Sequence, residues 1–217
     1  MDFSQIKNVV FALGRIGPGG VQLSGTAFVL DKPGFIATAS HVVGTDDNGL
    51  VLAYKKLSSL NDYQDTNDKS IETMPVKLHA VDPFHDLAVL KVDSSGKSNV
   101  KIGGADEAPV GTAISSFGFP HADHGRMVLT QQDTEIGARV LIASGGIKAK
   151  HFVLNVQARP GQSGSPVFRR SDGLLVGILV GSYAPGGTGG ISLAGVDPHT
   201  LHQTTHAVSA EYLSKMY

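Results

Sequence analysis

The sequence predicts an all-β protein built from many short strands. Three observations support this class: apolar stretches rich in Val, Ile, Leu or Phe recur along the chain, turn residues separate most of them, and helix-like spacing occurs only near the end. Asp-Lys-Pro-Gly at 31–34 and Ser-Asp-Gly at 171–173 are typical of such turns. Short strands separated in this way favour a β-barrel or a β-sandwich.

The expected strands follow the apolar stretches in chain order. They are Val21–Leu30, Phe35–Thr38, Val76–Val81, Leu87–Val92, Ala113–Phe117, Arg139–Ile142, Phe152–Val156, Leu174–Val180 and Ile191–Val196. The segment His199–Met216 is expected to be helical, because its apolar residues are loosely spaced for one helix face. The polar segment Ser58–Ser70 is expected to be a surface loop, and the break at Gly103–Pro109 to join two lobes.

Composition excludes several classes of function. The 217 residues, 41% hydrophobic and 17% charged, are typical of an ordered globular protein. A formal net charge of −1 gives no overall field toward nucleic acid or an anionic membrane, so neither is expected as a partner. The absence of cysteine excludes a thiol nucleophile and disulfides. No stretch is long enough to span a membrane, and Val9–Leu13 is too short for a secretory signal core, so we expect a cytoplasmic location.

Three motifs in the order His, Asp, Ser carry candidate chemistry. His41 directly follows an apolar stretch, Asp86 precedes another, and Ser163 lies in a glycine turn. A serine hydroxyl is a poor nucleophile near neutral pH, so a base must accept its proton, and histidine suits that task. A carboxylate then fixes the tautomer of the histidine. The N–H groups of Gly161 and Ser163 are candidates for an oxyanion hole.

These motifs resemble those of trypsin-like serine proteases, and within them the HtrA (Deg) type. The matching stretches are G-T-A-F-V-L-D-K-P-G-F-I-A-T-A-S-H-V-V, D-L-A-V-L-K-V, V-G-T-A-I-S-S-F-G-F-P and G-Q-S-G-S-P-V, within about residues 20–196. The resemblance implies two packed six-stranded antiparallel β-barrels, in lobes of about residues 1–105 and 106–198, and a helix at about 199–217. It implies His41 as general base, Asp86 as its orienting acid and Ser163 as nucleophile. A cofactor-free endopeptidase acting on protein substrates is therefore expected.

The chain departs from the trypsin pattern at two positions of the serine turn. Gln162 stands where secreted trypsins carry an aspartate that pairs with a newly cut N-terminus, so we expect activity without N-terminal cleavage. Ser165 replaces the usual second glycine after the nucleophile. No PDZ domain follows within these residues, unlike most HtrA proteins.

The resemblance also assigns the substrate pocket. It is lined by Gln157, Ala158, Arg159 and Pro160, by Val180, Gly181 and Ser182, and by the segment near Gly190–Leu193. None of these residues is acidic, so a strong demand for Lys or Arg before the scissile bond is not expected. Asp197 lies just beyond this set. We expect a small or medium apolar residue there.

Other interpretations stay open beside the protease. Ser163, Asp197 and His199 or His202 follow the order of an α/β-hydrolase, but the residues after the serine are strand-like rather than helical. Asp82 and His85 compete with Asp86 for the role of its segment, and we expect His85 to be a surface or rim side chain. A protease fold that serves as an inactive binding module fits the same sequence. So does a protease regulated by a partner or within a larger assembly.

The nine histidines give only weak support for a metal site. His121 and His124 flank Asp123, whereas His199, His202 and His206 are spaced for one helix face. Three ligands on one helix rarely meet at a single zinc ion, and the HExxH motif is absent. The glycine-rich loop at 186–190 lacks the Lys-Ser/Thr pair of a phosphate-binding loop. We therefore expect neither a metal nor a cofactor.

Overall fold

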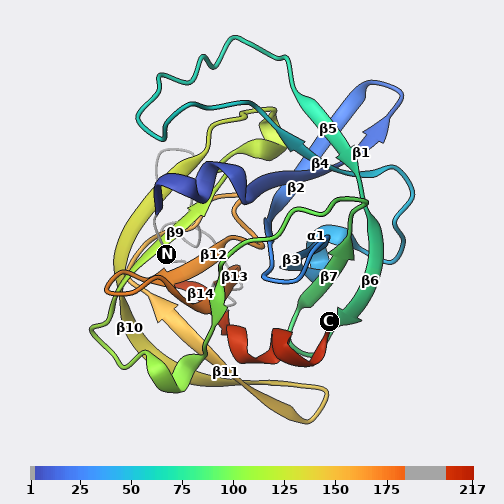
Figure 1. The fold of residues 1–217 in the computed structure, drawn as a ribbon. Coiled ribbons are helices and arrows are strands. Elements are labelled where there is room, and N and C mark those ends of the chain that lie inside the picture. Colours follow the sequence, from blue (N-terminus) through green and yellow to red (C-terminus); the bar gives the residue numbers. More distant parts are fainter. Residues whose placement is uncertain (1–2, 184–203) are drawn as a thin grey trace, which may run out of the picture.

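A computed structural model describes residues 3–183 and 204–217, which form two largely antiparallel β-sheets (Figure 1). The first sheet has the order β5-β4-β1-β2-β3-β7-β6 and the second the order β12-β9-β10-β11-β14-β13-β8. The strands of the first are β1 Val10–Gly17, β2 Gly20–Val29, β3 Phe35–Ala39, β4 Leu50–Tyr54, β5 Glu72–Pro75, β6 Lys77–Asp82 and β7 Leu87–Lys91. Those of the second are β8 Lys101–Ile102, β9 Ala113–Gly118, β10 Thr130–Ser144, β11 Ile147–Leu154, β12 Pro166–Arg169, β13 Leu174–Tyr183 and β14 Thr204–Ser209. The all-β prediction is confirmed.

The two sheets differ in how far they curl. β12 pairs with both β9 and β13, so β9 to β14 form a closed six-stranded barrel. In the first sheet β5 and β6 each pair with a single described neighbour, which leaves a curled, open half-barrel. The predicted pair of barrels is thus confirmed in architecture, with the difference that the N-terminal sheet has seven strands and does not close.

Helical structure is sparse in the described ranges. The single α-helix, α1, is one turn at Ser40–Val43, directly after β3. Short 3₁₀ helices occupy Phe3–Asn8, Ala105–Glu107, Ala122–His124 and Ala210–Lys215.

The prediction of a C-terminal helix from about residue 199 is wrong over residues 204–209. These residues form β14, which pairs with β11 on one side and β13 on the other. β-Branched residues such as Thr204, Thr205 and Val208 favour a strand, and pairing on both edges outweighs a weak helical spacing. Only Ala210–Lys215 is helical, as a 3₁₀ helix. The predicted strand Ile191–Val196 lies outside the described residues.

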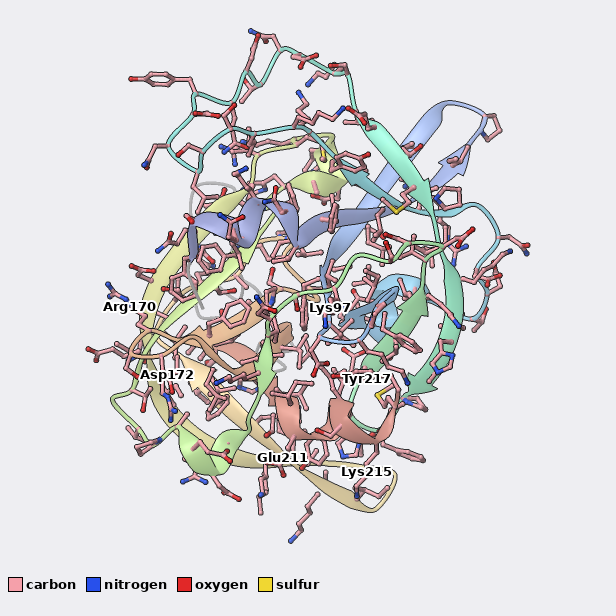
Figure 2. All side chains as sticks on the ribbon, viewed as in Figure 1. Lys97, Arg170, Asp172, Glu211, Lys215 and Tyr217 are labelled. Carbon is pink, nitrogen blue, oxygen red and sulfur yellow. The ribbon has the colours of Figure 1, made fainter. Side chains whose placement is uncertain are left out.

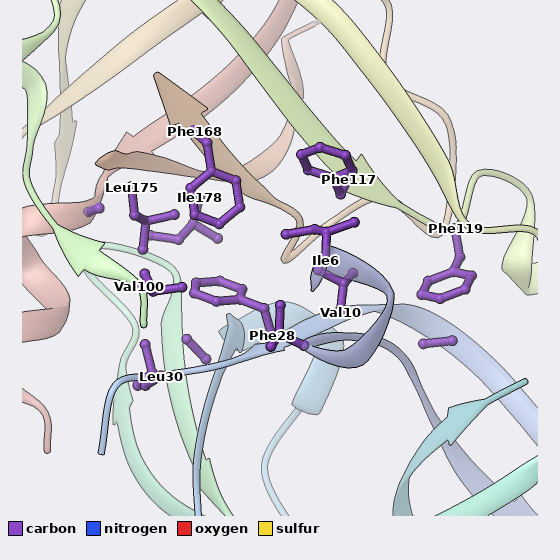
Figure 3. Packing of buried hydrophobic residues seen from close by; sticks show 14 of the residues in the cluster. Ile6, Val10, Phe28, Leu30, Val100, Phe117, Phe119, Phe168, Leu175 and Ile178 are labelled. Carbon is purple, nitrogen blue, oxygen red and sulfur yellow. The ribbon is translucent and has the colours of Figure 1, made fainter. Parts of the chain in front are cut away.

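An apolar core joins the two sheets. Phe28 of β2, Phe117 of β9 and Phe168 of β12 are fully buried in one cluster (Figure 3). The rings of Phe117 and Phe168 are tilted, with centroids 6.2 Å apart, an arrangement favourable for aromatic pairs. Ile6, from the N-terminal 3₁₀ helix, fills the same cluster. Dense packing here fixes β2 of the first sheet against β12 of the second.

Charged side chains lie on the outside of the molecule, as Figure 2 shows for Arg170 and Asp172 near the β12–β13 turn. Glu211 on the last 3₁₀ helix pairs with Lys150 of β11, with 3.1 Å between the charged atoms. This contact ties the end of the chain to the second sheet. Since the pair is partly exposed, its contribution to stability is small.

Candidate active site

His41 and Asp86 meet at the end of β3. Nδ1 of His41 lies 2.6 Å from Oδ2 of Asp86. The other carboxylate oxygen accepts hydrogen bonds from the backbone N–H of His41, at 2.9 Å, and from the hydroxyl of Ser40, at 2.7 Å. Both oxygens of Asp86 are therefore occupied, and the histidine side chain, 48% exposed, keeps its Nε2 edge for another partner.

The β6–β7 turn gives Asp86 an unusual backbone. Its φ of 54° is in the left-handed region, which Asp tolerates better than most residues. Its carbonyl oxygen accepts the N–H of Ser40 at 3.0 Å, so backbone and side chain both contact the start of α1. This strained residue is fixed by four contacts to Ser40 and His41, as is common where a side chain must be oriented.

His85 is half-buried, which fits the rim position among the two expected and not an open surface one. Its side chain is only 14% exposed, its Nδ1 lies 2.6 Å from Oδ2 of Asp82, and its ring stacks on Tyr212 with centroids 3.7 Å apart. Asp82 also accepts the backbone N–H groups of Phe84 and His85, so it organises the turn. Asp82 and His85 thus form a second His–Asp pair beside Asp86.

Asp86 is charged in this setting. Burial opposes ionisation, but hydrogen bonds from the His41 ring, the Ser40 hydroxyl and the His41 N–H outweigh it and lower the pKa of Asp86 below its ordinary value. A charged carboxylate beside Nδ1 of His41 favours the tautomer with a proton on Nδ1, which leaves Nε2 free to accept one.

The turn that carries Ser163 is fixed by backbone contacts. The carbonyl oxygen of Ser163 accepts the N–H of Thr26 at 2.8 Å, and the N–H of Gly164 donates to the carbonyl oxygen of Leu179 at 2.7 Å. Gly164 has a φ of +88°, and a Cβ there would overlap the carbonyl oxygen of Thr26 and the hydroxyl of Thr38. Glycine is therefore required by both conformation and space.

Gly25 shows how closely the serine turn and the histidine helix approach. A Cβ at Gly25 would lie 2.5 Å from Cγ1 of Val42 and 2.9 Å from the carbonyl oxygen of Ser163. The backbone of Ser163 and the residue after His41 therefore flank the same glycine. The structure brings the predicted histidine, aspartate and serine segments together at the C-terminal end of β3, beside the middle of β2.

The peptide group between Pro160 and Gly161 has a defined orientation. The carbonyl oxygen of Pro160 accepts the N–H of His121 at 2.7 Å, and the peptide is trans, so the Gly161 N–H points to the opposite side. The hydroxyl of Thr26 donates to the carbonyl oxygen of Gly161 at 2.8 Å. Within residues 3–183 and 204–217, neither the Gly161 nor the Ser163 N–H donates a hydrogen bond. Among the described residues, both donors therefore lack an acceptor.

The residues predicted to form the substrate pocket lie on two neighbouring segments. Ala158 donates its N–H to the hydroxyl of Thr205 at 2.8 Å, and Thr205 pairs with Ser182 across β14 and β13. Gln157 and Ala158 are half-buried, and Arg159 is exposed. Val180 is half-buried and packs against two apolar clusters, while Gly181 pairs with His206. The side chain of Ser182 and the segment Gly190–Leu193 lie outside what is described.

The competing interpretations find little support in the described residues. Ser163 leads into strand β12 rather than a helix, which contradicts an α/β-hydrolase elbow. His206 lies on β14, so the predicted helix face of three histidines does not form there; Asp197, His199 and His202 are not described. The ring of His124 lies 3.6 Å from the carboxylate of exposed Asp123, and no metal-binding group of three acidic or histidine side chains occurs in the described ranges.

Sequence reasoning missed three residues that organise the site. Ser40 and Thr26 lie within the motifs around His41. Their spacing in the sequence did not indicate that Ser40 hydrogen-bonds to Asp86 or that Thr26 hydrogen-bonds to Gly161. Thr205 was missed because its segment was expected to be helical.

Ser165 stands where a glycine is usual, and its Oγ is buried beside Gly118 without a hydrogen-bond partner in the described chain.

Comparison with protein families gives a match over residues 25–178 to the trypsin-like peptidase domain. A curated relative from Pseudomonas fulva is 30% identical over 190 residues, covering 82% of this chain and 34% of its own length. One from Ectopseudomonas mendocina is 29% identical over 188 residues, with the same coverage. Both are named as periplasmic serine endoproteases, DegP-like. The chain therefore spans about a third of the length of these relatives.

Solved structures with the same fold include two bacterial proteases. The protease domain of MamO from Magnetospirillum magneticum aligns with a TM-score of 0.66 at 16% identity, over 98% of this chain and 97% of that one. The Rv3671c protease of M. tuberculosis, in its active form, aligns with a TM-score of 0.66 at 17% identity, over 97% and 80% of the chains. At this identity the likeness concerns the fold alone.

The expectation of a cytoplasmic location is wrong. The relatives quoted above are named periplasmic, and a third, from Hahella chejuensis, carries the same name. The expectation relied on weak N-terminal features and on the lack of cysteine, which does not distinguish compartments. In the described part of the chain no helix is long and apolar enough to cross a membrane.

Proposed function

The chain belongs to the family of trypsin-like peptidase domains, and we propose that it is a serine endopeptidase acting on protein substrates. His41 is the general base, Asp86 orients it, and Ser163 is the nucleophile. The observation that carries this proposal is the 2.6 Å contact between Nδ1 of His41 and Oδ2 of Asp86, next to the glycine turn of Ser163.

In the first half of the reaction, the Oγ of Ser163 attacks the scissile carbonyl carbon while Nε2 of His41 takes its proton. The carbonyl oxygen gains negative charge, and the N–H groups of Gly161 and Ser163, which have no acceptor among the described residues, are the donors that stabilise it. His41 then gives the proton to the departing amine, and an acyl-enzyme ester remains on Ser163. Asp86 stabilises the positive imidazolium throughout.

In the second half, water attacks the ester and His41 takes a proton from it. The same two N–H groups hold the oxyanion again. When the ester bond breaks, Ser163 regains its proton from His41 and the new carboxyl product leaves. Every proton is returned, so the chain needs neither metal nor cofactor for this chemistry.

We also propose that this activity does not depend on N-terminal cleavage. The side chain of Gln162 donates a hydrogen bond to Gln132 within the chain. Secreted trypsins have an aspartate at the position of Gln162, and that aspartate pairs with the N-terminus formed by cleavage. The names of the relatives support protein substrates and a periplasmic location. Absence of acidic residues from the described pocket segments supports a small or medium apolar residue before the scissile bond.

A fluorophosphonate probe tests the proposal directly. We expect one probe per chain, attached to Ser163, as seen by mass spectrometry of the labelled peptide. His41→Ala should slow labelling strongly, because the serine then loses its base. A wild-type chain that stays unlabelled and cleaves no peptide would favour the alternative of an inactive binding module.

Replacing Asp86 by Asn should lower kcat by about 10⁴-fold at neutral pH, because the neutral amide no longer holds the required tautomer of His41.

The pKa of Asp86 is lower in the folded than in the unfolded chain. Its charge therefore contributes stability that is complete above about pH 4 and is lost as the pH falls through the folded pKa. Asp86→Asn should lack this acid dependence in urea unfolding followed across that range.

Asp82→Asn is the matched control, since Asp82 contacts His85 at the same 2.6 Å. Its kcat should change far less than that of Asp86→Asn. Equal losses in the two variants would contradict the assignment of Asp86 as the orienting acid.

A further inference from the structure

Two glutamine side chains, those of Gln64 and Gln162, hydrogen-bond to residues at the start of β10. Gln64, in the loop between β4 and β5, makes two hydrogen bonds to the backbone of Leu129, just before β10. Three residues later, Gln132 of β10 accepts a hydrogen bond from the side chain of Gln162 at 2.7 Å. The start of β10 therefore lies between a surface loop and the serine turn.

The orientation of both amide groups follows from their backbone partners. Oε1 of Gln162 accepts the backbone N–H of Arg159 at 2.7 Å, so its Nε2 must be the end that donates to Gln132. Gln64 donates to the carbonyl oxygen of Leu129 at 3.0 Å and accepts its N–H at 2.8 Å. Neither amide can be reversed without losing a hydrogen bond.

Gln162 lies between the two residues whose N–H groups form the proposed oxyanion hole. Its side chain is 1% exposed, so water cannot easily replace Gln132 as the acceptor. Anchoring the side chain fixes the orientation of the peptide groups on either side of Gln162. Those peptide groups carry the N–H of Ser163 and the carbonyl of Gly161.

The loop that carries Gln64 also packs Leu57, Leu60 and Ile71 against the apolar core, and Gln64 adds a polar link to the second sheet. The loop runs from residue 55 to 71 between β4 and β5, as the arch above these strands in Figure 1, and contains no strand. An ion pair between Lys55 and Asp68, 3.1 Å, closes its base. Gln64 lies 65 residues from Leu129 in sequence and joins the loop to the second sheet.

We propose that Gln132 is a positioning residue that holds the oxyanion turn through Gln162, and that Gln64 couples the 55–71 loop to it. Gln132 takes the part that a new N-terminus takes in secreted trypsins, but from a side chain inside the fold. This inference rests on the proposed peptidase activity. It implies that a change in the 55–71 loop can alter the alignment of the oxyanion donors in the serine turn.

Gln132→Met tests the first part, because Met has a similar length and no acceptor. We expect kcat to fall about 10- to 100-fold, since the oxyanion donors lose their alignment, with KM changed less than about twofold. Gln132→Glu keeps an acceptor for Gln162 and should restore kcat to within about threefold of wild type. Gln131→Met, on the exposed side of β10, is the control and should not change kcat.

Gln64→Met tests the loop. It should lower kcat by about three- to tenfold, and slow fluorophosphonate labelling in proportion, while the thermal midpoint of unfolding moves little. Equal loss in Gln132→Glu and Gln132→Met, or no loss in Gln132→Met, would overturn the positioning role. If Gln132→Met does not fold, Gln64→Met decides, and an unchanged kcat there overturns the proposal.

The outcomes separate this inference from the peptidase proposal. An active wild-type chain with an equally active Gln132→Met variant overturns the positioning role alone. A wild-type chain that neither labels nor cleaves overturns both.

Discussion

Ser163→Ala should reduce peptide cleavage by about 10⁶-fold in kcat, the largest effect expected for any single substitution in this chain. The variant lacks the atom that forms the acyl-enzyme, whereas its oxyanion donors and base remain. Its unfolding midpoint should stay unchanged, because the Ser163 contacts that hold the turn come from its backbone. Steady-state cleavage of a peptide library and thermal unfolding followed by circular dichroism measure the two quantities.

Ser165→Ala is the matched control two residues away. It removes a buried hydroxyl without a hydrogen-bond partner among the described residues, so activity should be kept and stability should stay equal or rise slightly. Wild-type cleavage by Ser163→Ala would show that another residue is the nucleophile.

Gly164→Ala should destabilise the fold by about 4 kcal/mol, the sum of left-handed strain and overpacking. Its φ is +88°, and the added methyl group would overlap the carbonyl oxygen of Thr26 and the hydroxyl of Thr38. A third neighbour, the backbone nitrogen of Ala39, would lie at 3.1 Å. Two of these three atoms belong to the backbone, so the site cannot make room for the methyl group without moving the backbone. Urea unfolding gives the free energy of unfolding.

Gly146→Ala separates strain from overlap. Gly146 has nearly the same φ, +83°, at the tip of the β10–β11 hairpin, and nothing lies within 4 Å of a Cβ there. It should cost only about 1 kcal/mol. Similar losses in Gly146→Ala and Gly164→Ala would mean that the packing around the serine turn is looser than described.

The sequence was most informative where chemistry restricts the choice of residue. His41, Asp86 and Ser163 could be selected from the chain because each stands beside an apolar stretch in a recognisable order, and the structure places their segments together. A glycine such as Gly164 could be expected in the turn, because only glycine adopts a left-handed φ readily and leaves room for closely packed neighbours. Local patterns of this kind need no knowledge of distant contacts.

Features that depend on pairing between distant segments could not be predicted. The first half of β10 reads Thr-Gln-Gln-Asp-Thr-Glu, which is typical of a loop, and it is a strand because β9 pairs with all six of these residues. β14 was mistaken for a helix for the same reason. The partners of Gln162 and Asp86 were equally hidden, since a hydrogen bond between side chains leaves no periodic signal.

The position of β12 has a consequence for the maturing chain. β12 begins three residues after Ser163 and closes the second barrel by pairing with β9 and β13 at once. The turn of Ser163, the proposed nucleophile, therefore adjoins the strand whose pairing completes the second barrel. Long-range strand pairing of this kind forms late and slowly. For the proposed peptidase, we therefore expect a partly folded chain to contain all three proposed catalytic residues without an assembled site, so that completion of the fold would guard against premature proteolysis.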